Sequence, residues 1–435
     1  MNDIAGMPYV KAEFDEDGKL KDAVSLPAGV TDLFVISHGW NNDAAEARAL
    51  YGKFFESFAA VVQPGDLQRR SLAVVGVIWP SKKFDELVTV SGTPEAAQGS
   101  ASLDAADEQS SKAIELKLDA MKKFFTRPAQ QQALDEAKAL LSDLEDKASA
   151  RRDFVSKIRS LLDAGAADKE DASKTFFKDD GNELMKNLKV DEDDLDEEVA
   201  GTGGGALMAP GVGTSRQEQG GAAGLKDMLS GFKAAAMNVL NYTTYYEMKT
   251  RAGTVGKNGV ATLIDELAPQ VRRIHLVGHS FGGRVVAAAA ANSATDKIKS
   301  MTLLQTAFSH NGFSKSMNGF FRAVVDEKRI DGPILVTHTK NDKAVGLAYP
   351  LASRINGDKR LAFGDENDVF GGIGRNGAQQ MQDGETISGK LLPAGETYQF
   401  QTGKFFNLEA SDFIKDHSDV AGKEIAYAVR MAVAA

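Results

Sequence analysis

The fold of this chain is constrained most by residues 274–283, which have the sequence IHLVGHSFGG. A short apolar run leads into Gly-x-Ser-x-Gly, and the alanine-rich segment that follows has a strong helix propensity. Small residues are needed two positions either side of the serine, because a sharp strand-to-helix turn brings the two backbones very close. Gly278 and Gly282 meet this requirement. The flanks therefore predict a buried strand, a strained turn at Ser280 and a helix, in preference to an ordinary glycine turn.

Apolar runs elsewhere predict further strands. Residues 33–37 and 72–79 are almost entirely apolar, which is typical of parallel strands buried on both faces. Helical spacing over 44–62 separates them, with Asp43 as the expected N-cap, so a right-handed parallel crossover should join the two strands. More strands are expected at 298–308, 334–338 and 398–406, and a last helix at 423–433. The sequence therefore predicts an α/β fold with a mostly parallel central sheet flanked by helices.

Residues 91–224 break this alternation, because they show helical spacing without a convincing strand. We expect a mainly helical, acidic insertion there, between a first part of the core at 1–90 and a second part at 225–435. The acidic run 191–198 lacks the glycine and the regular ligand spacing of a calcium loop, which favours a solvated loop. Residues 201–224 have the glycine content of a flexible linker. Three tyrosines further on are expected in the core, namely Tyr242, Tyr245 and Tyr246.

Composition narrows the class of protein. The formal net charge is −10 at pH 7, which argues against nucleic acid as a general partner. There is no cysteine, so disulfides, thiol catalysis and cysteine-bound zinc are excluded. No run approaches the roughly 20 apolar residues of a transmembrane segment, and the first residues lack the pattern of a secretory signal. We therefore expect a soluble cytoplasmic protein, with export by a signal-less route left open.

Partners for Ser280 can be sought downstream of the turn. A serine hydroxyl needs a base to take its proton, and that base needs a carboxylate to orient it. In folds built on such a turn, the acid and then the histidine follow the serine. Asp342 comes just after the predicted strand 334–338, and His417 is the only histidine after Asp342. The candidate nucleophile, acid and base are therefore Ser280, Asp342 and His417.

Other residues are alternatives for the acid and the base. His310, which follows the predicted strand 298–308, is the main rival for the base. His275 and His338 lie in or at the end of predicted strands, where packed histidines are expected. The rival acids are Asp365, Glu366 and Asp368. Three more carboxylates lie closer to His417 in sequence but are expected to cap the last helix, namely Asp412, Asp416 and Asp419.

The oxyanion of a reacting ester needs two backbone N–H groups aimed at one point. One is expected from Phe281, the residue after the serine, and the other from Trp40, in the turn after the first buried strand. The residues expected to shape the site are His38, Gly39, Gly278, His279 and Gly282. No His-x-x-x-His pair or similar ligand spacing is present, so no metal is expected.

The chain resembles the α/β-hydrolase superfamily through residues 33–40, 274–283, 334–345 and 416–420. More narrowly, the segment His38-Gly39-Trp40-Asn41-Asn42, together with Trp79-Pro80-Ser81 and the elbow Gly-His-Ser-Phe-Gly, is similar to a bacterial branch of that superfamily whose biological function is poorly defined. The resemblance leaves residues 91–224 unmatched. It implies a serine hydrolase without a cofactor, acting on esters, lipids or, less often, peptides. In this superfamily the insertion that forms a lid usually follows a later strand, whereas residues 91–224 precede the elbow. Whether they cap the site is therefore left open.

The expected activity is hydrolysis of a small-molecule or lipid carboxylic ester through an acyl-enzyme, as in esterases and lipases. The same elbow also serves serine peptidases and acyltransferases. A different class of function is a non-catalytic binding or scaffold protein, with residues 91–224 as the surface for a protein partner. A complete set of Ser, Asp and His candidates in the required order favours the enzyme.

Overall fold

A computed structural model describes residues 3–63, 65–67, 70–81, 103–168, 171–189, 231–342, 351–357 and 370–435. The predicted acidic loop at 191–198 and the linker at 201–224 lie outside these residues. The chain divides into two compact units. The first comprises Met1–Lys83, Met248–Gly346 and Gly364–Ala435, and the second comprises Phe84–Glu247 and Leu347–Phe363.

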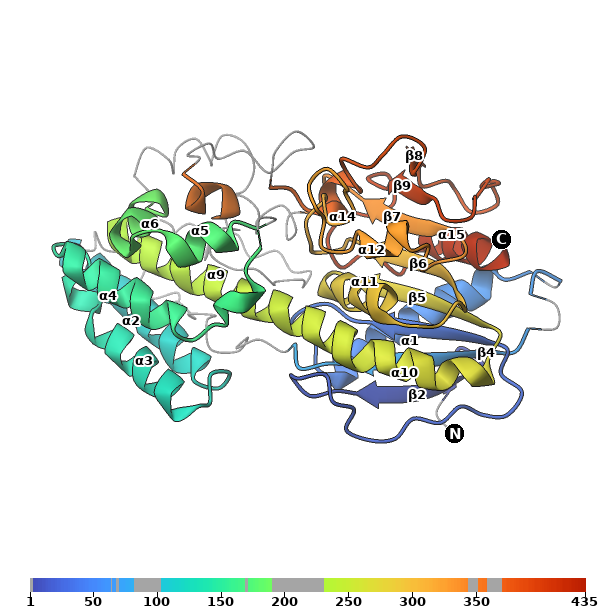
Figure 1. Cartoon of the computed structure of the whole chain (residues 1–435), viewed down its shortest axis with the longest axis horizontal. Helices are drawn as coiled ribbons and strands as arrows, with labels where there is room; N and C mark the ends of the chain where they lie inside the picture. The colour runs from blue at the N-terminus through green and yellow to red at the C-terminus, as the bar shows by residue number, and fades with distance from the viewer. Residues whose placement is uncertain are drawn as a thin grey trace. The chain divides into compact units, whose positions relative to one another are not determined.

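The first unit is built on one sheet (Figure 1). In the described part of the chain its nine strands have the order β1-β2-β4-β3-β5-β6-β7-β9-β8. Among these nine described strands, β1 pairs antiparallel with β2, and the other pairings are parallel. The strands are β1 (Asp3–Ile4), β2 (Met7–Glu13), β3 (Asp32–Ser37), β4 (Leu72–Ile78), β5 (Arg273–His279), β6 (Ile298–Leu304), β7 (Ile334–His338), β8 (Thr386–Lys390) and β9 (Phe405–Glu409).

Helices cover both faces of this sheet (Figure 1). On one face α1 (Ala44–Val61) packs against α15 (Lys423–Ala434), and their apolar side chains share a core with Phe34 and Val277 of the sheet. On the other face α11 (Phe281–Asn292) contacts β3, β5 and β6. The expected N-cap forms, because the Asp43 carboxylate accepts hydrogen bonds from the first turn of α1. The remaining elements of this unit are α10 (Ala261–Leu267), α12 (Ala323–Asp326), α14 (Ile373–Asn376), a 3₁₀ turn (Ala268–Gln270) and a π-helical segment (Val255–Val260).

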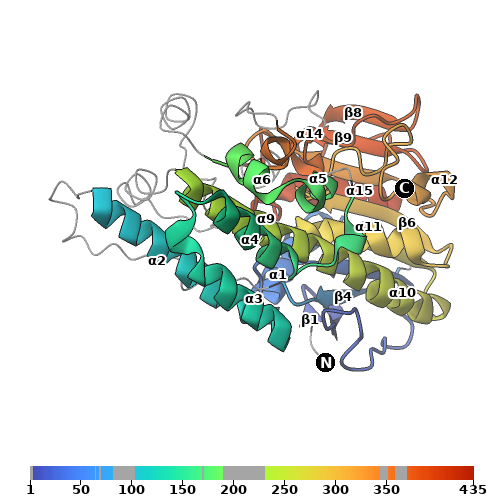
Figure 2. The same ribbon diagram turned by 60° about the vertical axis from the view of Figure 1, so that its left-hand side comes forward.

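In the second unit, the described elements are helices (Figure 2). They are α2 (Leu103–Met121), α3 (Pro128–Ala139), α4 (Ala148–Arg159), α5 (Ser173–Lys178) and α6 (Gly181–Asn187), with 3₁₀ turns at Leu141–Asp143 and Ala164–Ala166. The long helix α9 (Gly231–Thr254) contains the boundary between the units. Its tyrosines at 242, 245 and 246 are buried, as predicted.

The parallel sheet with helices on both faces confirms the predicted α/β class. The crossover β3-α1-β4 is parallel, as expected, because β3 and β4 pair in parallel register. Within the described residues, no helix has the length and apolar character needed to span a bilayer. Since β3, β5, β6, β7 and β9 run in one direction, the turns that follow them lie at one edge of the sheet. That edge is where the candidate site residues are found.

Candidate active site

Ser280 sits in a strained turn between β5 and α11. Its backbone angles are φ 55° and ψ −125°, a region that residues with a Cβ rarely adopt. Its N–H donates to Leu304 O at 3.0 Å, and its carbonyl oxygen accepts from Ala307 N at 3.1 Å. The end of strand β6 and the residues just after it therefore hold the turn through two backbone hydrogen bonds. This conformation is the one expected of a nucleophile elbow.

Glycines make this turn sterically feasible. A Cβ on Gly282 would lie 2.1 Å from Ser37 O, and one on Gly278 would lie 2.4 Å from Gly282 O. A Cβ on Gly39 would lie 2.7 Å from Ser280 Cβ. The two predicted turns are therefore in direct contact, and only residues without a side chain fit between them.

The structure brings Asp342 and His417 together. His417 Nδ1 lies 2.8 Å from Asp342 Oδ2, and the Asp342 side chain is fully buried, whereas that of His417 is 20% exposed. A carboxylate oxygen can only accept, so Nδ1 carries the proton and Nε2 keeps its lone pair. That tautomer is the one a general base needs in order to take a proton from a serine.

A neighbouring asparagine ties the acid loop to the base loop. Asn341 donates through Nδ2 to Ser411 O at 3.0 Å and to Ile414 O at 2.8 Å. The hydroxyls of Thr339 and Ser411 are 2.8 Å apart. The segment after β7 and the segment that leads to the histidine are therefore fixed to each other. The only sequence signal for Asn341 is its position next to the candidate acid Asp342.

The charges around His417 raise the pKa of its imidazole. Burial disfavours the imidazolium, but the charge and the hydrogen bond of Asp342, with a smaller contribution from Asp416, outweigh it and raise the pKa of His417. A base that gains a proton from serine becomes an imidazolium. Because Asp342 stabilises that cation, the pair is suited to general-base catalysis.

His279 connects the elbow to the base. Its Nε2 donates to His417 O at 2.8 Å, and the two rings lie 4.9 Å apart between centroids. Burial lowers the pKa of His279 to about 3, and the nearby His417 acts in the same direction. His279 is therefore neutral. Because it is the residue before Ser280, its hydrogen bond ties the backbone of His417 to the elbow.

His38 holds the other turn in place. Its ring stacks on Trp79 with centroids 5.6 Å apart, its Nδ1 donates to Gly39 O at 2.8 Å, and its Nε2 accepts from Trp79 N at 3.3 Å. Its backbone N–H donates to the hydroxyl of Tyr51, which in turn donates to Val77 O. Burial lowers the pKa of His38 to about 4. The ring is therefore neutral, with one defined tautomer.

The side chains of the two residues that carry the candidate oxyanion donors are in contact. The rings of Trp40 and Phe281 meet edge to face with centroids 5.8 Å apart. Asn42 stabilises the same turn by donating to Gly39 O at 3.3 Å and to Trp40 O at 3.0 Å. Tyr51, whose hydroxyl accepts from the His38 N–H, was not predicted to support the site. A tyrosine in an amphipathic helix has the sequence pattern of an ordinary core residue.

The rival residues are placed differently. His310 is buried and lies 3.1 Å from Asn376 through Nδ1, whereas Asp342 pairs with His417. His275 is buried in β5, 2.8 Å from the Ser300 hydroxyl, and contributes to packing. The rival acids Asp365, Glu366 and Asp368 lie outside the described residues. Among the described residues, no group of three or more His, Asp or Glu side chains could hold a metal ion.

A comparison with protein families gives a match to part of the chain. Residues 267–328 fit the family model for the alpha/beta hydrolase fold, and this segment contains β5, Ser280, α11 and β6. The chain has the α/β-hydrolase fold. No significant match came from curated proteins or from solved structures. The α/β-hydrolase match confirms the predicted fold class and supports a hydrolase in general.

Proposed function

We propose that this chain is a serine hydrolase that cleaves carboxylic esters of small molecules or lipids through an acyl-enzyme. The Ser280 hydroxyl attacks the ester carbonyl while His417 Nε2 takes its proton. The backbone N–H groups of Trp40 and Phe281 bind the oxyanion that develops. His417 then gives the proton to the leaving alcohol, which leaves the acyl group on Ser280. A water molecule, deprotonated by His417, releases the acid and restores the free serine.

The observation that carries this proposal is the hydrogen bond between His417 Nδ1 and Asp342 Oδ2, in a loop that contacts His279, the residue before the strained Ser280. It leaves the base nitrogen available in the correct tautomer, at the edge where β5 and β7 end. The contact of Gly39 with Ser280 and of Trp40 with Phe281 supports an oxyanion site at the same place.

Hydrolysis of p-nitrophenyl esters of increasing acyl length tests the proposal. We expect turnover by the wild type, with a burst of p-nitrophenolate where deacylation is slow, and a loss of at least about 10³-fold in Ser280→Ala. Ser388→Ala, an exposed residue of β8, is the matched control and should keep full activity. Full activity of Ser280→Ala would refute the assignment. Peptide substrates are tested in parallel, and cleavage of a peptide faster than of the esters would reassign the chain as a peptidase. Added alcohols are tested as acyl acceptors, and acyl transfer to an alcohol faster than hydrolysis would reassign it as an acyltransferase.

A further inference from the structure

Arg284 is a nearly buried cation on the first turns of α11. The residue is 3% exposed. Its guanidinium offers five N–H donors, of which the Nε–H donates to Lys249 O at 3.0 Å. In the part of the chain that the structure describes, no carboxylate lies within ion-pair distance of it, and neither Nη nitrogen has a hydrogen-bond acceptor. Arg284 is therefore a mostly buried side chain whose two Nη nitrogens have no acceptor among the described residues.

Two other arginines have fuller sets of partners. Arg151, also buried, donates to Asn182 Oδ1 and to Leu144 O, both at 2.6 Å. Arg322 forms a two-point ion pair with Glu385. Removing a guanidinium from water without an anion or a full set of acceptors is unfavourable. The Nη nitrogens of Arg284 lack such acceptors among the described residues, so an anion would find unused donors there.

Aromatic rings form one wall of this site. The Arg284 guanidinium carbon lies 4.8 Å from the ring centroid of Phe320 and 5.3 Å from that of Phe321. Such rings attract a cation, but they offer no carbonyl or carboxylate acceptor to its N–H groups. Phe320 is 54% exposed, so the wall reaches the surface. A ligand with an oxyanion and an apolar body would satisfy both the cation and the ring.

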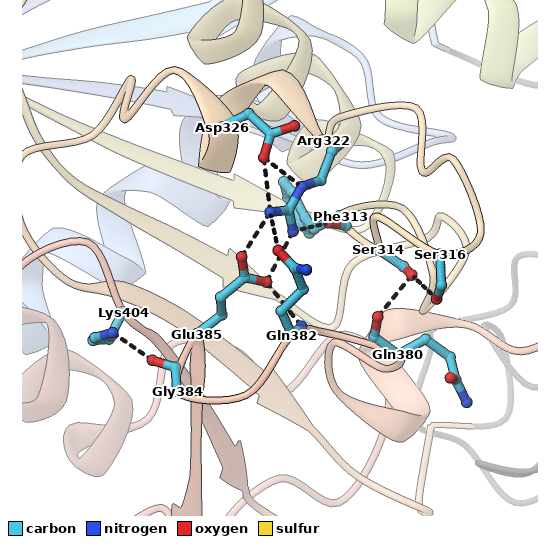
Figure 3. A network of polar contacts seen from close by, with 10 residues as sticks. All are labelled: Phe313, Ser314, Ser316, Arg322, Asp326, Gln380, Gln382, Gly384, Glu385 and Lys404. Atoms are coloured by element: carbon cyan, nitrogen blue, oxygen red, sulfur yellow. Dashed lines mark hydrogen bonds and ion pairs between the residues drawn. The ribbon is translucent and has the colours of Figure 1, made fainter.

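The aromatic wall is held in place by a polar network (Figure 3). Arg322 binds both carboxylate oxygens of Glu385, at 2.8 Å and 2.6 Å, and also Asp326 at 2.8 Å. The Ser314 hydroxyl donates to Gln380 O at 2.7 Å. The chain that carries the two phenylalanines is thus fixed to residues 380–385. A wall that is ordered before binding reduces the entropy lost when a ligand binds.

The position of Arg284 relates it to the candidate nucleophile. Residues four apart on a helix lie on the same face, and a helical side chain leans toward the N-terminal end. Arg284 is four residues after Ser280, a rise of about 6 Å along the helix. Its side chain therefore leans toward the edge of the sheet at which Ser280 lies.

We propose that Arg284 binds an oxyanion, a carboxylate or a phosphate, carried by the ester substrate. The preferred substrates are then esters with a second, negatively charged group, whose apolar part packs on Phe320. This inference rests on the proposed function, because it places the anion on the molecule that Ser280 attacks. Free anions are the other source of the same chemistry, and the experiments below separate the two.

The first experiment compares kcat/KM for mono-p-nitrophenyl glutarate and for the neutral p-nitrophenyl butyrate. In Arg284→Gln the ratio of the anionic to the neutral ester should fall about 10- to 100-fold, the range expected for losing charge-assisted hydrogen bonds. Arg284→Lys, which keeps the charge but not the planar fork, should recover part of the ratio. Arg152→Gln, which changes an exposed arginine of α4 paired with Asp180, should leave it unchanged. An unchanged ratio in Arg284→Gln would overturn the proposal.

The second experiment measures binding without chemistry. Calorimetry with glutarate and with inorganic phosphate compares Ser280→Ala with the double variant Ser280→Ala/Arg284→Gln. Binding that is lost only in the double variant supports an anion site at Arg284 even if the wild type hydrolyses no ester, in which case the proposed function alone fails. Binding of the free anions combined with an unchanged ester ratio overturns the assignment to the substrate.

Thermal unfolding in anion-free buffer distinguishes a ligand site from a structural strut. Arg284→Gln should melt no lower than the wild type, because the substitution removes a buried cation that lacks an anion. A large drop in the melting temperature, with anion binding retained, would show that Arg284 only braces α11 against α9 and would overturn the proposal.

Discussion

Asp342 decides the charge state of the candidate base. Its carboxylate raises the pKa of His417, whereas burial of the ring acts in the opposite direction. A general base must be neutral, so activity should rise with pH as His417 loses its proton. This rise is the acidic limb of the pH–activity profile. The pH at which it occurs therefore reports the interaction between Asp342 and His417.

Asp342→Asn should lower kcat by about 10³- to 10⁴-fold, because the amide no longer stabilises the imidazolium or the required tautomer. The acidic limb of kcat/KM should also move to lower pH, since burial of His417 is then opposed only weakly. Profiles measured with a p-nitrophenyl ester test both effects. Asp416→Asn is the control, because this exposed carboxylate acts on His417 only through its charge. It should shift the limb slightly and keep kcat. An acidic limb that does not move in Asp342→Asn would contradict the account.

Some of these residues were accessible from the sequence and others were not. Ser280, Asp342 and His417 were predicted as a set from the motif and from the chain order that it requires, and the structure pairs Asp342 with His417. Asn341 and Tyr51 were not predicted, because their partners are backbone groups of segments distant in the chain. The same holds for Arg284, since the absence of a carboxylate near a buried arginine is visible only after folding.

At the scale of elements, the close approach of α11 to β3 creates the elbow. A methyl group on Gly282 would meet Ser37 O at 2.1 Å and His38 O at 2.5 Å. Backbone atoms cannot move aside as a flexible side chain can. The helix would have to shift away from the strand, and Ser280 would move with it.

Gly282→Ala should therefore lower the free energy of unfolding by about 1–3 kcal/mol and abolish ester hydrolysis. Gly52→Ala is the matched control in α1, where a Cβ would have no atom within 4 Å. It should raise the free energy of unfolding by about 0.5–1 kcal/mol, because alanine restricts the unfolded chain and favours a helix. Urea unfolding of both variants gives the comparison. Equal stability of the two alanine variants would show that the elbow is not sterically constrained.

The strands differ in how well the sequence predicts them. Strands β3, β4, β5 and β7 are buried and apolar, and the sequence located them to within one or two residues. Strand β8 is mostly exposed at the edge of the sheet, so it carries no apolar pattern. Strand β9 begins at Phe405 rather than Tyr398, because Tyr398 and Phe400 instead stack on each other at 4.8 Å. Burial on both faces leaves a pattern in the sequence, whereas edge pairing does not.

At the scale of the whole molecule, buried histidines make stability depend on pH. An unfolded histidine has a pKa near 6.5, whereas burial lowers the pKa of His38 to about 4 and that of His279 to about 3. At pH values between 6.5 and the lowered pKa of each histidine, the unfolded chain binds a proton that the folded chain does not. The stability from these two residues is complete above pH 6.5 and is lost as the pH falls. His417 has the opposite sign, because its folded pKa is raised.

Acidification from pH 7.5 to pH 5 should therefore destabilise the protein, with His38 alone contributing about 2 kcal/mol. His38→Gln should show a smaller loss of stability over this range than the wild type. His417→Gln should show a larger loss, because it removes a group that is stabilising when protonated. Urea unfolding at the two pH values measures both differences. The same pH dependence in all three proteins would exclude these histidines as its source.

The central claim is that Ser280 is an activated nucleophile. The most direct test is incubation of the purified chain with a fluorophosphonate, followed by intact-mass measurement and peptide mapping. We predict one adduct per chain, on Ser280, formed by the wild type, slowed in His417→Gln and absent from Ser280→Ala. A folded wild-type protein that gains no adduct at Ser280, or an adduct that persists in Ser280→Ala, would contradict the account.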